Sequence, residues 1–485
     1  MTKKLRHSLV ADSAISLSPA KAGVQTKRAR EDAPRLVTFK DWAPAFSGEK
    51  GVRTIAAALL ATVAFATPAA AQTVAITNAK LVIGDGGQPV DGGTVVIRDG
   101  KVVAAGPGVA VPAGIRVIDA GGKWVSPGIF AGFTRLGIVE VDGVDETNDS
   151  GASGTPFHAA IDVTPAVNPK STPIAINRAE GITRAVVAPD NRGSIFAGQG
   201  AIIDLGSDMD AVSKPRAFQF MEWGEAGARA AGGSRPAAYA ALKNVLFEVR
   251  DYVRAPGSYT DRGKDAFLTR ADAEALVPVV QGRMPLLVHV ERASDILVLL
   301  QLKKEMPALK LVFVGATEGW TVASQIAAAG VPVIATALND LPESFEQLAA
   351  SQSNIGRMTA AGVLVGIGTI NQDEARQARW EKQYAGNLVA LTKVPGATGL
   401  DWGAAFAAIT SKPAEALGLG GEFGSLKPGR RGDVVIWDGD PLEIGTSAVN
   451  VFIDGVEQPL ENRWTRLRQR YLDPKEGALP KAYQR

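Results

Sequence analysis

The sequence contains no cysteine and only three histidines, His7, His158 and His289. Without thiols the chain can form neither a disulfide nor a thiolate metal site. Three imidazoles are also few for a metalloenzyme, because a catalytic zinc site uses about three protein ligands and a water. Long apolar runs are lacking as well: the most apolar segment covers residues 55–66, whereas a bilayer span needs about 20 apolar residues. We therefore expect no disulfide and no helix that spans a membrane.

The first 71 residues have the features of segments that are removed from a mature protein. Residues 1–50 are polar and show no sustained hydrophobic period, so we interpret them as a non-structural extension. Residues 51–71 contain a basic start, the apolar residues 55–66 and the small-residue site Ala69-Ala70-Ala71, which together are typical of a secretory signal peptide. We expect cleavage after Ala71 and a periplasmic or secreted protein. A buried or amphipathic helix is the alternative interpretation of the apolar run.

The charge of the chain changes sign when this segment is removed. The whole sequence has a formal net charge of +2. Residues 1–71 hold 11 Lys and Arg against 5 Asp and Glu, which leaves 41 basic and 45 acidic residues in the 414 that follow, a net charge of −4. We expect no basic face with interleaved aromatic residues in this mature part. The sequence therefore predicts no nucleic-acid partner and no stable membrane insertion.

Two segments near the ends of the mature chain share a β-rich pattern. Residues 72–126 are predicted to form short strands with tight turns, including a hairpin around Asp99-Gly100. Residues 414–456 repeat this character, so we predict one small β-sandwich domain built from both segments. The polar, basic residues 457–485 are predicted to form a C-terminal tail.

The middle of the chain, residues 127–413, alternates short apolar runs with helical patterns. Repeated βα units predict an α/β fold with a parallel sheet, and a segment of this length is typical of a (β/α)8 TIM barrel. Periodicity alone leaves an open doubly wound sheet as the alternative, although no Gly-x-Gly-x-x-Gly stands at a strand–helix turn. We predict strands at 181–188, 285–290, 311–314, 331–335 and 362–368, helices at 293–305, 320–329, 344–350 and 373–391, and a helical insertion at 205–262.

Several motifs in a fixed order resemble the amidohydrolase superfamily of metal-dependent hydrolases. Pro127-Gly128 lead into an apolar strand, as at the start of the barrel in that family. A closing block similar to that of the family follows at residues 408–419, 424–436 and 451–455. Each motif alone is weak, but their order and spacing together favour the same fold.

The resemblance also implies a chemistry. Val288-His289, followed by Arg292 and Asp295, is most similar to the imidazolonepropionase- and dipeptidase-like branch of the superfamily. Members of the superfamily hydrolyse carbon–nitrogen bonds in amides, lactams or dipeptides rather than ordinary peptide bonds. The resemblance therefore implies a hydrolase that uses zinc or another divalent metal.

The residues that would hold this metal are mostly replaced. The resemblance aligns the family's ligand positions with Phe133 and Arg135 on strand one, Gly315 on strand six and Ile370 on strand eight. None of these side chains can ligate a metal ion. Only His289, on strand five, is retained as a candidate ligand, and no bridging lysine is identified on strand four. We therefore expect weak or no metal-dependent hydrolysis.

The residues at these positions have other interpretations. His289 is a lone ligand, a substrate contact or a general base near neutral pH, or it is a remnant whose partner is a neighbour such as Asp295. Arg135 binds an acidic ligand bidentately, or it pairs with an internal carboxylate, because an unpaired buried charge is costly. Phe133 and Ile370 are expected to fill the place of the metal as part of the core.

Three further residues, Asp190, Arg192 and Gln199, follow an early strand and are predicted to contact a bound small molecule. Two functions stay open at this point. The chain is either a hydrolase with an altered site or a catalytically inactive pseudoenzyme that binds a ligand or supports a partner. The partners we expect are a small-molecule ligand and, for the assembly, a homo-oligomer or a complex with a related active amidohydrolase.

Overall fold

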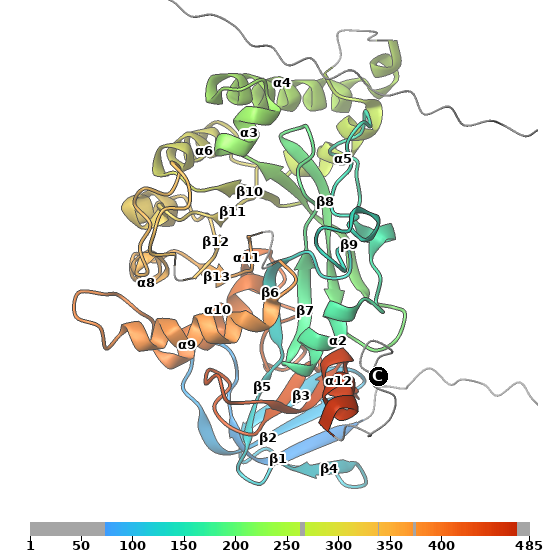
Figure 1. Cartoon of the computed structure of the whole chain (residues 1–485), viewed down its shortest axis with the longest axis vertical. Helices are drawn as coiled ribbons and strands as arrows, with labels where there is room; N and C mark the ends of the chain where they lie inside the picture. The colour runs from blue at the N-terminus through green and yellow to red at the C-terminus, as the bar shows by residue number, and fades with distance from the viewer. Residues whose placement is uncertain (1–72, 262–266, 338, 372–374, 473–485) are drawn as a thin grey trace, which may run out of the picture. The chain divides into compact units, whose positions relative to one another are not determined.

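The computed structural model describes residues 73–261, 267–337, 339–371 and 375–472 (Figure 1). The expected N-terminal extension, the signal peptide and the last 13 residues lie outside the described residues. The described part is a mixed α/β fold with two eight-stranded sheets. None of its helices is long and apolar enough to cross a membrane.

The smaller sheet combines strands from both ends of the described chain. Its order is β16-β15-β14-β5-β1-β2-β3, with β4 paired to β1. Val434 of β14 pairs antiparallel with Pro127 of β5, which joins the two halves. The strands are β1 (Val74–Leu81), β2 (Val90–Arg98), β3 (Lys101–Pro107), β4 (Arg116–Asp119), β5 (Trp124–Pro127), β14 (Val434–Trp437), β15 (Ala448–Ile453) and β16 (Val456–Glu457).

The eight strands form one continuous sheet. The expected β-sandwich of two separate layers therefore remains a prediction. A bridge between Lys101 and Arg431 brings the β3 end of the sheet close to the start of β14, and the sheet folds back on a core of apolar residues that includes Ile76 and Phe452. The hairpin at Asp99-Gly100 forms as predicted. Both turn residues have positive φ, 51° and 74°, as a two-residue turn between twisted strands requires.

The larger sheet is a nearly closed barrel. Its order is β13-β12-β11-β10-β9-β8-β7-β6. Between the first and last strands, the backbone N–H and the hydroxyl of Thr369 both donate to the carbonyl of Phe133, at 3.1 and 3.0 Å. The strands are β6 (Ile129–Thr134), β7 (Ile182–Val187), β8 (Phe196–Asp204), β9 (Val212–Glu222), β10 (Leu286–Val290), β11 (Leu311–Gly315), β12 (Val333–Ala335) and β13 (Val365–Ile367).

The barrel departs from a regular (β/α)8 pattern at β8, which runs antiparallel to both of its neighbours. The predicted helical insertion at 205–262 is helical in its second half, at α3 (Gly224–Ala230) and α4 (Arg235–Arg254), but its first half contains the strand β9. The physical cause of the antiparallel pairing is connection length. Residues 188–195 and 205–211 are the links on either side of β8, and a parallel crossover needs a dozen or more residues.

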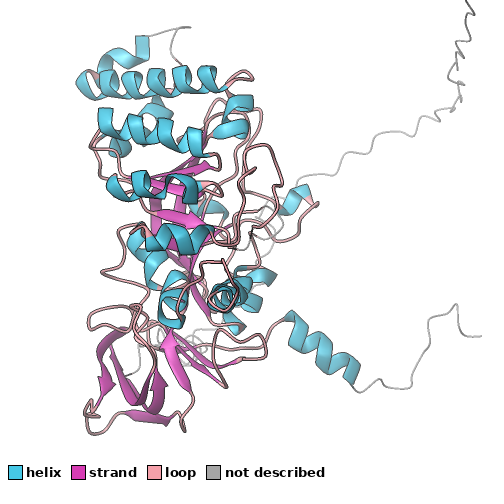
Figure 2. Ribbon diagram, turned by 90° about the vertical axis from the view of Figure 1, so that its left-hand side faces the viewer, coloured by secondary structure: helices cyan, strands magenta, loops and turns pink. Residues whose placement is uncertain are grey.

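Helices surround the barrel strands (Figure 2). The predicted helix at 293–305 matches α6, but residues 344–350 form turns. There the side chains of Ser344 and Gln347 accept hydrogen bonds from nearby backbone N–H groups and so compete with a helix. The helices are α2 (Thr172–Ala179), α3 (Gly224–Ala230), α4 (Arg235–Arg254), α5 (Arg270–Val280), α6 (Ala293–Glu305), α7 (Ala323–Ala328), α8 (Asn354–Ala360), α9 (Glu381–Leu391), α10 (Trp402–Ala408), α11 (Ser411–Ala416) and α12 (Arg463–Leu472), with 3-10 turns η1 (Asp145–Thr147), η2 (Thr164–Ala166), η3 (Pro256–Asp261), η5 (Gly319–Val322) and η6 (Ala378–Trp380).

Alternation along the barrel strands creates two apolar cores. On β10, Leu287 belongs to the cluster that also contains Phe133 and Phe220. The next residue, Val288, belongs to the cluster that includes helix residues such as Leu299. Successive strand residues point to opposite faces of a sheet. One cluster therefore fills the barrel and the other packs between the barrel and its helices, which leaves the strand ends to carry polar groups.

A buried cation joins the barrel to the smaller sheet. Arg184 of β7 is 1% exposed. Its guanidinium donates to both carboxylate oxygens of Asp433, at 2.8 and 2.9 Å, and lies 2.8 Å from Asp454 and 3.5 Å from Asp204. Burial raises the pKa of Asp204 to about 6, against the opposing attraction of Arg184. The buried guanidinium is thus surrounded by three carboxyl groups, of which Asp454 reaches the surface.

We expect Arg184→Met to destabilise the fold by about 3–5 kcal/mol, because it leaves buried carboxylates without their cation. Arg116→Met is the control: Arg116 pairs with Glu457 on the surface, where an ion pair contributes about 0–1 kcal/mol. The measurement is the free energy of unfolding from urea titrations of both variants. Equal, small losses for the two substitutions would contradict a structural role for the buried cluster.

Candidate ligand-binding site at the carboxyl end of the barrel

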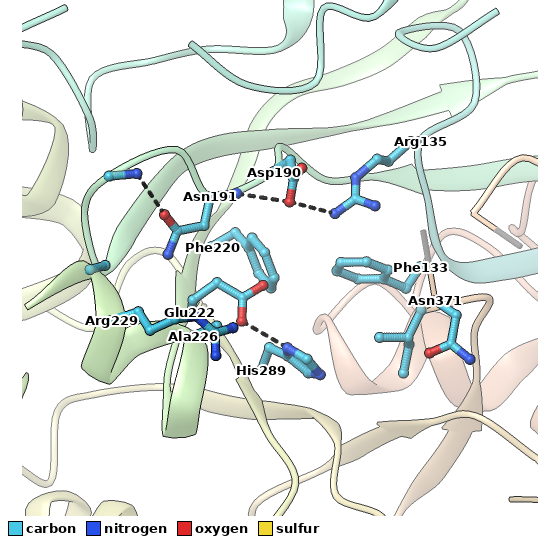
Figure 3. Close-up of a pocket in the computed structure, with 13 residues that line it drawn as sticks. Phe133, Arg135, Asp190, Asn191, Phe220, Glu222, Ala226, Arg229, His289 and Asn371 are labelled. Carbon is cyan, nitrogen blue, oxygen red and sulfur yellow. Dashed lines mark hydrogen bonds and ion pairs between the residues drawn. The ribbon is translucent and has the colours of Figure 1, made fainter. Parts of the chain in front are cut away.

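A cavity of about 550 Å³ opens where several barrel strands end (Figure 3). In barrel enzymes the carboxyl ends of the strands carry the functional site, and the volume lies within the range of small-molecule pockets. The cavity is lined by Phe133, Arg135, Asp190, Asn191, Gly193, Phe220, Glu222, Ala226, Arg229, Ala230, His289, Ile370 and Asn371.

His289 is held between two carboxylates. Its Nδ1 lies 2.8 Å from Glu222, and its Nε2 lies 3.0 Å from Glu291. The parallel register of β9 and β10 puts Glu222 directly beside His289. Glu291 follows His289 by two residues and therefore shares its face of the strand. Both ring nitrogens are thus engaged by the protein itself.

These carboxylates fix the protonation state of the imidazole. Burial opposes a charge on His289, but the charge and hydrogen bond of Glu222 and those of Glu291 outweigh it, so the pKa of His289 is raised well above its ordinary value. Burial acts in the opposite direction on Glu291, yet its hydrogen bond to His289 and the imidazolium charge lower the pKa of this carboxyl. Glu222 and Glu291 thus both favour the charged form of the imidazole.

The side chain of Glu291 occupies the space beside Gly315. The backbone N–H of Thr317 donates to its second carboxylate oxygen at 2.8 Å. Gly315 has a φ of +89°, and a Cβ on this residue would collide with the carboxylate of Glu291. Glycine is therefore required here by both backbone conformation and space. The position aligned with a metal-binding histidine is the place where the structure accommodates Glu291.

Arg135 forms an ion pair with Asp190 in the wall of the cavity. Its Nη2 lies 3.0 Å from Oδ1 of Asp190, and both side chains are largely buried. The Nε of Arg135 is buried without a hydrogen-bond partner in the described residues. Asp190 also accepts from the backbone N–H of Asn191. Arg135 thus has an internal carboxylate beside it, while its guanidinium still lines the cavity (Figure 3).

Apolar side chains form the opposite wall. Phe133 is 1% exposed and its ring lies 5.3 Å from that of Phe220, at an angle of 56°. Ile370 is also buried and belongs to the same cluster inside the barrel. Phe133 and Ile370 therefore pack into the barrel core at the positions aligned with metal ligands.

The other predicted contacts do not all reach the cavity. Asp190 lines it, whereas Arg192 is half-exposed and lies 3.6 Å from Asp190 without lining the cavity. Gln199 is buried in β8, where its backbone bonds Ile161 and Val163. The suggestion that Asp295 satisfies His289 is wrong. The carboxylate of Asp295 bonds the guanidinium groups of Arg235 and Arg292, because the start of α6 turns it away from the strand.

Four polar residues of the cavity were not identified from the sequence. Asn191, Arg229 and Asn371 lie in loops or short helices, where no periodic pattern marks them. Glu222 ends the strand β9, which lies in the segment where the sequence predicts a helical insertion. One signal was available for its neighbour Glu291, since the spacing His289-x-Glu291 on a strand puts both side chains on one face.

The cavity residues do not fit a catalytic divalent metal. Among the residues the structure describes, no group of three or more His, Cys, Asp or Glu side chains is arranged to hold a metal ion. His289 has no ring nitrogen to spare, and Phe133 and Ile370 have no donor atom. The guanidinium groups of Arg135 and Arg229 line the same cavity and would repel a cation.

Comparisons with known proteins agree with this architecture. Residues 305–461 match the model of the amidohydrolase family. The amidohydrolase tasK of Hapsidospora irregularis is 24% identical over 404 residues, covering 76% of this chain and 39% of the relative. The chain therefore spans about two fifths of the length of the curated relative it matches. The crystal structure of an amidohydrolase from Thermotoga maritima MSB8 superposes with a TM-score of 0.69 at 22% identity, covering 79% of this chain and 99% of that one.

The fold and cavity define a barrel-like α/β protein with a cavity at the carboxyl ends of its strands. Part of the chain is similar to the amidohydrolase family model, and a longer part is similar to the amidohydrolase tasK. The Thermotoga structure shows the same fold.

We call the pairing of His289 with Glu222 and Glu291 the clamp on His289. We expect this clamp to stabilise the fold in a pH-dependent way. Because its pKa is raised above the value of about 6.5 in an unfolded chain, the stabilisation is complete below that pH and is lost as the pH rises through the folded-state pKa. The free energy of unfolding of the wild-type protein should therefore fall from pH 6.5 upward relative to His289→Gln. Urea titrations between about pH 6 and pH 9 test this expectation. Parallel curves for the two proteins would show that the imidazole is not charged.

Proposed function

We propose that the protein binds a small organic molecule bearing a carboxylate in the barrel cavity and has little or no metal-dependent hydrolytic activity. The observation that carries this proposal is the clamp on His289. A ligand-competent imidazole needs a free, unprotonated nitrogen, and here both nitrogens face carboxylates. The superfamily that this chain resembles acts on carbon–nitrogen bonds. We therefore expect the bound molecule to be similar in shape to a substrate with such a bond.

The lining of the cavity supports this ligand class. Arg135 offers a planar guanidinium suited to two hydrogen bonds with a carboxylate. Asn191 and Asn371 supply amide groups that can pair with an amide, and Phe133 and Phe220 supply an aromatic wall. A molecule such as N-benzoylglycine, with an aromatic ring, an amide and a carboxylate, matches all three features and is a practical probe.

Hydrolysis of a carbon–nitrogen bond is the second candidate. The observation that favours it is the position of Glu222 and His289 at the carboxyl ends of neighbouring strands, where barrel enzymes carry out their chemistry. An imidazolium can donate a proton to a leaving nitrogen. In this cavity one of the two carboxylates would first have to give up its hydrogen bond with the ring of His289. The branch most similar to this chain, imidazolonepropionase- and dipeptidase-like, belongs to this candidate.

We further propose that the protein is exported and acts beside a related, active amidohydrolase. The signal-peptide pattern at residues 51–71 supports export. The second idea follows from the replaced ligand positions, because a barrel without its own metal chemistry can support a related chain that has it.

Metal content and hydrolysis together separate the two candidates. We expect protein purified without chelator to contain far less than one zinc per chain and to leave N-benzoylglycine and a panel of dipeptides and lactams intact. Elemental analysis and amine-release assays provide the measurements. Stoichiometric zinc that resists dialysis would overturn the proposal. Hydrolysis that disappears in His289→Gln without any change in metal content would establish the second candidate instead.

We expect Arg135→Lys to weaken binding of N-benzoylglycine by about tenfold, or about 1.4 kcal/mol. Lysine keeps the positive charge but cannot form the two parallel hydrogen bonds that a planar guanidinium makes with a carboxylate. Lysine can still pair with Asp190, so the fold should be retained. Arg192→Lys is the matched control, since Arg192 does not line the cavity. Titration calorimetry of both variants measures the effect. Equal affinities of the wild-type protein and Arg135→Lys would exclude Arg135 from the ligand contact.

A further inference from the structure

The last described helix, α12, is strongly basic and lies on the surface. It spans Arg463–Leu472 and has no buried residue. It carries four arginines, Arg463, Arg466, Arg468 and Arg470, and no acidic residue. In Figure 2 it stands away from the barrel strands. The sequence pattern predicted a basic tail here, and the structure adds that ten of its residues form a helix.

The apolar residues of α12 share one face. Trp464, Leu467 and Tyr471 are spaced by three and four residues, which places them in one stripe along a helix. Tyr471 is 70% exposed and the adjoining Leu472 is 66% exposed. Arginines border the stripe on both sides because they occupy the intervening positions. Trp464 contacts Arg379 and Leu467 is half-buried, so Tyr471 and Leu472 are the apolar residues that remain free to enter a membrane interface, with the neighbouring arginines toward the headgroups.

The first turn of α12 is attached to the body of the protein. Asn462 accepts hydrogen bonds from the backbone N–H groups of Trp464 and Thr465. The guanidinium of Arg379 lies over the ring of Trp464, 4.4 Å from its centre. The last turn has no such contact among the described residues, so the helix is anchored at one end and presents Tyr471 and Leu472 at the other.

The positive charge of this helix is not neutralised by the protein. Arg466 lies 3.8 Å from Glu461 in an exposed pair. Arg463, Arg468 and Arg470 form no ion pair within the described part of the chain.

The charge is also concentrated at one end of residues 72–485, the part that follows the proposed signal peptide and is otherwise acidic. Residues 463–485 hold seven Lys and Arg and two Asp and Glu, a net charge of +5. Residues 72–462 hold 34 basic and 43 acidic residues, a net charge of −9. The expectation that the mature chain has no basic face with interleaved aromatic residues is therefore wrong at this helix. An anionic surface would attract this end and repel the rest, which fixes an orientation.

We propose that α12 docks the protein peripherally on an anionic phospholipid bilayer. The exposed pair Tyr471 and Leu472 favours a bilayer over an acidic protein or a nucleic acid, since charge alone would suffice for those partners. Basic residues near an anionic membrane each add to the attraction, and Tyr471 with Leu472 can enter the interface. Because no described helix can span a membrane, the association is at the surface and is reversible.

Vesicle sedimentation of the full chain tests this proposal. We expect at least tenfold stronger binding to vesicles with about 30% anionic phospholipid than to purely zwitterionic ones. Binding should fall steeply as salt rises from about 0.1 M to about 1 M, where the screening length drops from about 10 Å to about 3 Å. Arg468→Glu with Arg470→Glu should reduce binding to anionic vesicles by at least tenfold.

Two further variants keep the experiment decisive. Lys304→Glu with Lys310→Glu reverses the same number of charges on exposed residues elsewhere and should leave binding unchanged. Tyr471→Ser with Leu472→Ser should weaken vesicle binding several-fold without altering the charge. Equal binding by the wild-type protein and the Arg468/Arg470 variant would overturn the proposal. So would unchanged binding after loss of Tyr471 and Leu472, because a helix that senses only charge has no interfacial role.

Discussion

The pairing of buried charges is the constraint on which this structure depends. Arg184 joins the barrel to the smaller sheet through Asp433 and Asp454, with almost no contact with solvent. Removing one member of such a cluster leaves an uncompensated charge in a medium of low polarity, which is far more costly than losing a surface pair. The two sheets, built from segments distant in the sequence, are therefore held in one relative arrangement by a few oriented ionic bonds.

The cavity follows the same rule. Where the resemblance places ligands for a divalent cation, this chain has an imidazolium between two carboxylates and a guanidinium beside Asp190. Both groups lie beside protein carboxylates, while the Nε of Arg135 has no hydrogen-bond partner among the described residues. Gly315 shows that the substitutions are mutually adjusted, because its missing side chain provides the space for Glu291. This is why we favour ligand binding over metal-dependent hydrolysis as the use of the cavity.

The barrel and the smaller sheet were largely predictable, because alternating apolar runs and turn residues are local signals. The hairpin at Asp99-Gly100 and helix α6 were predicted almost to the residue. The strand β9 was missed for a physical reason as well: its exposed first half, around Lys214, lacks the continuous apolar run of a buried parallel strand. The turns at 344–350 were missed because side chains there bond the backbone in place of a helix.

The sequence by itself determined which chemistry this chain is short of: it has no thiol, few imidazoles, and aromatic or cationic residues where a related family has ligands. The tertiary structure alone decided how the remaining polar groups are paired. Glu222 lies 67 residues from His289, and Asp190 lies 55 residues from Arg135. Such pairs depend on strand order and register, which no local pattern records, because each is set by the packing of the whole barrel.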